Sequence, residues 1–209
     1  AGNPLASTGN PNAARIVASG FRNPFRFAFR PGTGEVWPGD VGWDTWEEIN
    51  RVKSPTAAPV HDFGWPCNEG DAQQSGYSSL DMCGALYADT TNPSVAPYYA
   101  YQHGAALNDS DPCPTANGSS TTGLAFYDTG AYPTRFRKAL FFADHTRNCI
   151  WAMMPGSNGL HDPTTIQDFV ESAATPADPA LGPHGDPFAA DHDARAVPPV
   201  PSPPLAPRP

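Results

Sequence analysis

The sequence lacks a long apolar run, a basic surface and an initiator methionine. No stretch approaches the roughly 20 apolar residues that a membrane-spanning helix requires, so no membrane span is expected. The 12 lysine and arginine residues are outnumbered by 21 aspartate and glutamate residues, which argues against nucleic acid as a partner. The chain opens in a loop rich in asparagine, proline and serine, and we expect it to be part of a longer protein with further domains.

The cysteines also lack the spacing of a metal site. None of the four forms a CxxC pair and no histidine stands at zinc spacing, which argues against a structural zinc ion. An even count in a chain with few lysines favours two disulfides in an oxidising compartment, so we expect a secreted or cell-surface protein. Proximity favours the pairs Cys67–Cys83 and Cys113–Cys149. Two other connectivities and four reduced thiols remain as alternatives.

Proline and glycine are abundant, at 26 and 19 residues, and such chains are rich in turns and poor in long helices. We expect a domain over residues 1–193, with an insertion at about 67–121 that shows little periodic structure, and a disordered proline-rich tail over 194–209. Apolar alternation predicts short strands in several places. They fall at residues 15–19, 27–29, 35–37, 48–52, 123–127, 139–142, 149–153, 166–170 and 185–191.

A weak internal sequence repeat indicates how these strands are organised. Asp40, Asp144 and Asp191 each end an apolar strand after a small residue, and they lie 104 and 47 positions apart. Propeller blades of four strands run about 40–50 residues, so the second spacing is one blade. The first spacing is about two blades, lengthened by the cysteine-rich insertion. The pattern favours a β-propeller over a sandwich.

Four motifs then occur in a fixed order: Gly20-x-Arg22-Asn23-Pro24, Gly39-Asp40-x-Gly42, Glu47-Glu48-Ile49-Asn50 and Phe63-Gly64-Trp65-Pro66. The series resembles the glucose/sorbosone dehydrogenase family, soluble quinoproteins related to aldose sugar dehydrogenase. The resemblance implies an all-β chain: the later three to four blades of a six-bladed β-propeller, with a disulfide-bonded insertion. It is similar to the version found in secreted, multidomain bacterial proteins.

The same resemblance implies pyrroloquinoline quinone (PQQ) held at the channel mouth by calcium. By motif, Arg22 and Asn23 fall where the family places cofactor and substrate contacts. A fixed guanidinium suits that place because it can bind a carboxylate and stabilise negative charge on a reduced quinone. Gly42 and Trp43 fall where the family offers backbone carbonyls to calcium, which prefers such oxygen ligands.

Two departures from the family pattern stand out. The family's catalytic histidine lies upstream of the Arg-Asn-Pro motif, but the 21 residues before Arg22 contain no histidine. The family also sets basic residues from later blades against the cofactor's carboxylates. Arg147 is the candidate at the first such place, and residues 174–178 offer no cation at the second. The six histidines that follow Arg22 are interpreted as surface or loop residues: His61, His103, His145, His161, His184 and His192.

Each assignment has a structural alternative. The alternative for Arg22 is a purely structural ion pair with Asp40 or Glu47 that clamps one blade to the next. The alternative for Glu47 and Glu48 is that they are solvated charges at a strand end. Packing within the blades is favoured over a sugar platform as the role of the tryptophans, namely Trp37, Trp43, Trp46 and Trp65.

Three functions therefore compete. The first is an oxidoreductase that oxidises small-molecule aldose sugars through the quinone, with this chain inactive by itself because the base lies elsewhere. The second is a propeller that binds carbohydrate without redox chemistry, and the third is an interaction domain of a cell-surface protein. The Arg-Asn-Pro and Gly-Asp-x-Gly motifs favour the first function, and the missing second cation favours the second.

Overall fold

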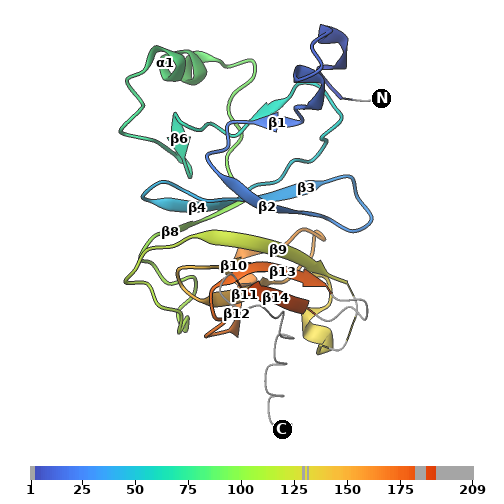
Figure 1. Cartoon of the computed structure of the whole chain (residues 1–209), viewed down its shortest axis with the longest axis vertical. Coiled ribbons are helices and arrows are strands. Elements are labelled where there is room, and N and C mark those ends of the chain that lie inside the picture. Colours follow the sequence, from blue (N-terminus) through green and yellow to red (C-terminus); the bar gives the residue numbers. More distant parts are fainter. Residues whose placement is uncertain (1–2, 129, 131, 182–186, 192–209) are drawn as a thin grey trace. The chain divides into compact units, whose positions relative to one another are not determined.

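The computed structural model describes residues 3–128, 130, 132–181 and 187–191 and consists of two compact units, residues 1–103 and 104–209 (Figure 1). Strands dominate both units. Within the described ranges the α-helical content is α1 (Asp81–Ala88), and no helix is long and apolar enough to cross a membrane. The short 3-10 helices are η1 (Ala6–Thr8), η2 (Ala13–Arg15), η3 (Thr134–Phe136) and η4 (Pro163–Thr165).

Unit 1 is built on a four-stranded antiparallel sheet in the order β2-β3-β4-β8. The strands are β2 (Pro24–Phe29), β3 (Val36–Asp40), β4 (Trp46–Ile49) and β8 (Tyr99–Gln102). The turn over residues 31–34 joins β2 and β3 as an antiparallel hairpin. Trp37 and Ile49 are fully buried in the central strands, so the sheet supplies the core of this unit.

Residues 67–103, the part of the expected insertion that belongs to unit 1, are more structured than their sequence predicts. We call them the disulfide-bonded segment. It contains the hairpin β6 (Asn68–Glu69) and β7 (Ala72–Gln73), helix α1, and the edge strand β8 that completes the sheet. The predicted disulfide Cys67–Cys83 joins the start of the hairpin to α1. A short parallel pair, β1 (Ala18–Ser19) and β5 (His61–Asp62), joins the residues before β2 to the residues just before Cys67.

Unit 2 repeats the four-stranded plan in the order β9-β10-β11-β12. The strands are β9 (Thr121–Tyr127), β10 (Ala139–Asp144), β11 (Cys149–Met153) and β12 (Gln167–Val170), and β13 (Pro176–Leu181) with β14 (Pro187–Asp191) forms a further hairpin. Every residue of β9, β10 and β11 is buried, which explains why these strands read as continuous apolar runs. The predicted disulfide Cys113–Cys149 fixes the preceding loop to β11.

The repeated strand-ending aspartates, Asp40, Asp144 and Asp191, occupy equivalent places in the structure. In three antiparallel pairs the first residue of one strand pairs with the aspartate that ends the next, as in Pro24↔Asp40, Thr121↔Asp144 and Pro176↔Asp191. Each pair also has a register shift beside that aspartate. Recurrence of one bulge at one place is typical of repeated blades rather than of a single irregular sheet.

The sequence was less accurate about exposure and strand ends. The alternation at residues 27–29 is that of a half-buried strand, but Phe27 and Phe29 are 59% and 65% exposed on β2, which lies at the edge of its sheet. The strand expected at residues 15–19 is limited to β1, since a 3-10 helix occupies residues 13–15. The strand expected at 185–191 is observed from Pro187, and the proline-rich tail at 194–209 lies outside the described residues.

Candidate functional site

A buried aspartate holds the Arg-Asn-Pro loop at the end of β3. The carboxylate of Asp40 accepts hydrogen bonds from the backbone N–H of Arg22 at 2.9 Å and of Asn23 at 2.6 Å. The Arg22 side chain is exposed, and its Nη1 donates to the Val41 carbonyl at 3.0 Å. The clamp between Arg22 and Asp40 therefore exists, but it uses the backbone of residue 22 and leaves the guanidinium at the surface.

A second carboxylate organises the adjacent loop. Oε1 of Glu69 accepts the backbone N–H groups of four consecutive residues, Trp43, Asp44, Thr45 and Trp46, at 2.9–3.1 Å. Glu69 is 4% exposed and lies in the β6–β7 hairpin that follows Cys67. Burial alone would raise the pKa of Glu69. The four hydrogen bonds together have a larger and opposite effect, so the pKa of Glu69 is lowered. The disulfide-bonded segment thus fixes the conformation of residues 43–46.

The same loop presents oxygen atoms that suit a calcium ion. Within the part of the chain that the structure describes, the carbonyl oxygens of Gly42 and Trp43 accept no hydrogen bond. Glycine is required at position 42 because a Cβ there would lie 1.6 Å from the Trp46 carbonyl oxygen. Backbone carbonyl oxygens on a fixed loop are ligands of the type that calcium accepts, and the binding of an ion by Gly42 and Trp43 stays a prediction.

Glu47 is also buried, and it joins the loop to the end of β8. Its Oε2 accepts from the Gly42 N–H at 3.3 Å, and its Oε1 lies 2.6 Å from Nε2 of His103. Glu47 is 0% exposed, which excludes the solvated strand-end charge considered as an alternative. His103, interpreted from sequence as a loop histidine, is therefore the partner of a buried carboxylate.

Two further carboxyl groups of unit 1 have raised pKa values. Burial raises the pKa of Asp40 to about 6, against the opposing effect of the backbone bonds from Arg22 and Asn23. Burial likewise raises the pKa of Glu48 to about 7, although Asn50 and Gly70 donate hydrogen bonds to it. Burial alone would raise the pKa of Glu35, but hydrogen bonds from Arg51, Trp37 and Arg30 lower it to about 2.

These shifts predict that unit 1 is most stable near pH 4 to 5. Asp40 and Glu48 bind protons more tightly when folded, so their contribution is lost as pH rises through about 6 and 7. We expect about 3 kcal/mol from each, since one pKa unit is about 1.4 kcal/mol. Glu35 acts in the opposite direction, because its contribution is lost as pH falls from 4.5 toward 2. Urea unfolding followed by tryptophan fluorescence at pH 3, 5 and 8 measures this profile, and a midpoint that rises from pH 5 to 8 would contradict it.

Arg147, the predicted cofactor contact in unit 2, has a fully buried side chain. Its Nε donates to Ser119 Oγ at 2.8 Å and its Nη1 to the Ala105 carbonyl at 2.7 Å. A hollow of about 460 Å³ lies against this region, lined by Arg147, Asn148, Glu171 and neighbouring residues. The guanidinium holds the loop before β9 in place, and its contact with a cofactor stays a prediction.

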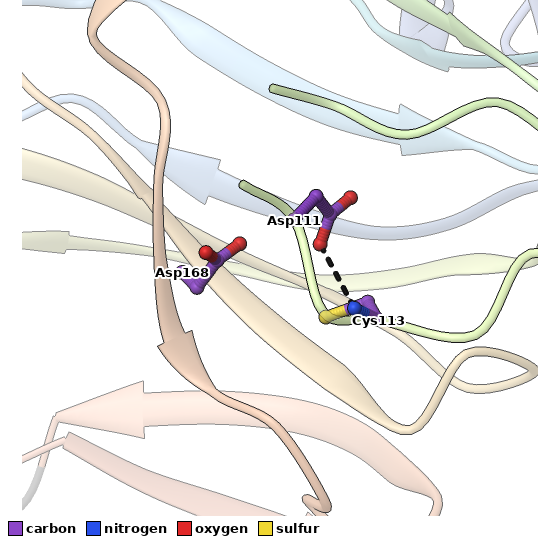
Figure 2. A group of neighbouring side chains, drawn as sticks. All are labelled: Asp111, Cys113 and Asp168. Carbon is purple, nitrogen blue, oxygen red and sulfur yellow. Dashed lines mark hydrogen bonds between the residues drawn. The ribbon is translucent and has the colours of Figure 1, made fainter. Parts of the chain in front are cut away.

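Unit 2 also contains a pair of neighbouring carboxylates, Asp111 and Asp168, beside Cys113 (Figure 2). The three groups lie within 4.8 Å of one another, but the Cys113 sulfur is bonded to Cys149 and is no thiolate ligand. Asp111 accepts hydrogen bonds from Cys113 N, Leu107 N and Trp151 Nε1. Burial and the charge of Asp111 raise the pKa of Asp168. These bonds give the pair a structural role in ordering residues 107–113.

The predicted site residues of unit 1 are brought together on two adjoining loops. Asp40 holds Arg22 and Asn23, and the next residues along the chain carry Gly42 and Trp43. Arg147 belongs to the other unit, so its convergence with these residues also stays a prediction. Sequence reasoning missed Glu69 and His103, because neither lies in a recognisable motif.

Comparison with known proteins identifies the family. The family model described as Glucose / Sorbosone dehydrogenase matches residues 1–154. No curated protein matches the chain.

Solved structures share the fold at low sequence identity. A PQQ-bound aldose sugar dehydrogenase from Streptomyces coelicolor is 22% identical, with a TM-score of 0.52, and the match covers 93% of this chain and 45% of that one. A putative oxidoreductase (glucose dehydrogenase) from Thermus thermophilus is 20% identical, with a TM-score of 0.58 and coverage of 91% and 44%. A further glucose dehydrogenase is 18% identical, with a TM-score of 0.57 and coverage of 90% and 46%.

The chain therefore spans less than half the length of these structures. The likeness confirms the predicted fold class, an all-β partial propeller with two disulfides. Because the family model matches well over half of the 209 residues, the chain belongs to the Glucose / Sorbosone dehydrogenase family.

Proposed function

We propose that this chain is part of a secreted sugar dehydrogenase that oxidises aldoses with PQQ and calcium. The carrying observation is the loop over residues 42–46, whose amides converge on Glu69 while the carbonyls of Gly42 and Trp43 accept no hydrogen bond among the described residues. A loop fixed in this way offers ligands to a cation without having to reorganise. The two disulfides are compatible with an extracellular location.

The proposal assigns calcium binding and cofactor binding to different residues of unit 1. The carbonyl oxygens of Gly42 and Trp43 would hold calcium, and the exposed Arg22 with Asn23 would bind the anionic edge of the cofactor. When bound, PQQ supplies a hydride acceptor and calcium supplies a Lewis acid. Asp40 would act indirectly, because its two backbone hydrogen bonds position Arg22 and Asn23.

This chain by itself should not turn over sugar. The 21 residues before Arg22 contain no histidine, and loss of a general base typically lowers a rate about 10²–10⁴-fold. We infer that a longer protein carries the base upstream of this chain. A carbohydrate-binding or cell-surface propeller without redox chemistry is the second candidate, favoured by the buried position of Arg147.

Cofactor titration of the longer protein tests the proposal. In the presence of calcium, Arg22→Ala should weaken PQQ binding at least about tenfold, because a charge-assisted hydrogen bond contributes about 1.5–3 kcal/mol. Arg15→Ala, which removes another exposed arginine of the same unit, is the matched control. Dye reduction with glucose should require both calcium and PQQ.

Equal PQQ affinity in Arg22→Ala and the wild type would refute the assignment of Arg22. A longer protein that binds sugar but never reduces dye would favour the binding-propeller function. Turnover by the 209-residue chain alone would show that the base does not lie upstream.

A further inference from the structure

Unit 2 contains two Asn-Gly pairs, Asn117-Gly118 before β9 and Asn158-Gly159 after β11, and the sequence has no others. An asparagine followed by glycine can react with its own backbone, because the glycine nitrogen can attack the side-chain carbonyl carbon. The two groups belong to one short stretch of chain, which gives the attack a high effective concentration. Glycine favours it further, since no Cβ lies beside the attacking nitrogen.

The reaction needs water alone. A bond forms between the backbone nitrogen of the glycine and Cγ of the asparagine, the C–N bond of the side-chain amide breaks, and ammonia leaves with the proton of the backbone N–H. Water then opens the cyclic imide at either of its carbonyls and gives aspartate or isoaspartate. Both products carry a carboxylate where the asparagine carried an amide.

At Asn117 the attacking nitrogen is not engaged. Among the described residues, the Gly118 N–H donates no hydrogen bond and the Asn117 side chain makes none. Asn117 is exposed in a turn, and Gly118 has a φ of +83°. A Cβ added at position 118 would meet no atom within 4 Å, so no neighbouring group shields the pair.

At Asn158 both reacting groups are engaged. The Gly159 N–H donates to the Gly156 carbonyl at 3.0 Å, and the Oδ1 atom of Asn158 accepts from the Leu160 N–H at 2.9 Å. These bonds hold the proton that the nitrogen has to lose and restrict the side-chain rotation that the attack requires. Asn158 is also exposed, so hydrogen bonding rather than exposure distinguishes it from Asn117.

The loop that contains Asn117 also holds Arg147. Ser119 is buried, and its Oγ accepts from Nε of Arg147 at 2.8 Å. The next residue, Ser120, donates its backbone N–H to the Asp144 carboxylate at 2.9 Å, and the Arg147 N–H donates to the same carboxylate at 2.9 Å. Isoaspartate would lengthen the main chain by one carbon immediately before these contacts, so they could not all keep their geometry.

We propose that Asn117 is a site of spontaneous deamidation, and that its conversion to isoaspartate weakens the hydrogen bonds by which residues 119 and 120 hold Arg147. This inference does not depend on the proposed function, because the reaction involves only the chain and water. It separates two asparagines that the sequence makes equivalent.

Peptide mapping of the 209-residue protein after incubation at alkaline pH tests the site. In the folded protein we expect Asn117 to convert at least about tenfold faster than Asn158, whose two hydrogen bonds have to break first. In concentrated urea, where those bonds are lost, the two asparagines should convert at similar rates. Asn158→Gln is the matched control and should leave the rate at Asn117 unchanged. Asn117→Gln should abolish conversion at residue 117, because the longer side chain would have to close a larger ring.

Hydrogen exchange of the separated isoaspartate form tests the effect on Arg147. The Arg147 Nε–H and the Ser120 amide should exchange at least about tenfold faster than in the unconverted protein, while the amides of Trp43 to Trp46 in unit 1 should be unchanged. Asn117→Asp adds the charge without lengthening the main chain and should leave both groups protected. Equal conversion of the two asparagines in the folded protein, or none at Asn117, would overturn the site. An isoaspartate form with unchanged exchange at Ser120 and Arg147 would overturn the effect on Arg147.

Discussion

Replacing Glu69 by alanine is expected to destabilise unit 1 by about 3 kcal/mol and to release the loop over residues 43–46. Four backbone N–H groups lose one shared acceptor in this variant, and hydrogen bonds to a charged group are worth about 1.5–3 kcal/mol. The cost falls below the sum of four bonds because the freed amides can recruit water. Urea unfolding measures the stability, and hydrogen exchange at the amides of Trp43 to Trp46 measures the local effect.

Two variants bracket this prediction. Glu69→Gln keeps an oxygen where the four N–H groups meet but removes the charge, so it should lose about half as much stability. Asp71→Ala removes an exposed carboxylate two residues away and should leave both readouts within about 0.5 kcal/mol of the wild type. Unchanged protection of the four amides in Glu69→Ala would show that the loop does not depend on this carboxylate.

Glu69 also shows where sequence reasoning reached its limit. The strands of unit 2 were predicted well because residues 123–127, 139–142 and 149–153 are apolar runs whose burial on both faces leaves a direct signal. Asp40 and Asp144 were also found, since a strand-ending aspartate recurs with the blade and bonds the backbone of the preceding loop in both units. Glu69 recurs nowhere, so only the fold reveals its partners.

Strand β8 was missed for a related reason. Tyr99 to Gln102 lie after a long segment without periodicity, and four residues are too few to establish an alternation. The pairing of Glu47 with His103 depends on β8 lying beside β4 in register. The sequence therefore predicted the loops that present the site better than the contacts that hold those loops.

The two disulfides should each stabilise the unit that contains it, and by different amounts. In the chain-entropy model, closing a loop with a sequence separation of 16 residues, as in Cys67–Cys83, is worth about 3 kcal/mol. The separation of 36 residues in Cys113–Cys149 gives about 4 kcal/mol. We therefore expect C67A/C83A to lower the stability of unit 1 and C113A/C149A to lower that of unit 2 somewhat more. Alanine is the suitable replacement because all four cysteines are buried and a serine hydroxyl would lose its hydrogen bonds to water.

Hydrogen exchange resolved by residue distinguishes the two variants. C67A/C83A should reduce protection in β3 and β4 and also at the amides of Trp43 to Trp46, because the disulfide orders the hairpin that carries Glu69. C113A/C149A should reduce protection in β10 and β11. If C67A/C83A left the loop amides protected while the global stability of unit 1 fell, the disulfide would act only through the unfolded chain. The Glu69 contact would then be formed by the hairpin itself, because β6 and β7 pair through Asn68↔Gln73 and Glu69↔Ala72 independently of the bridge.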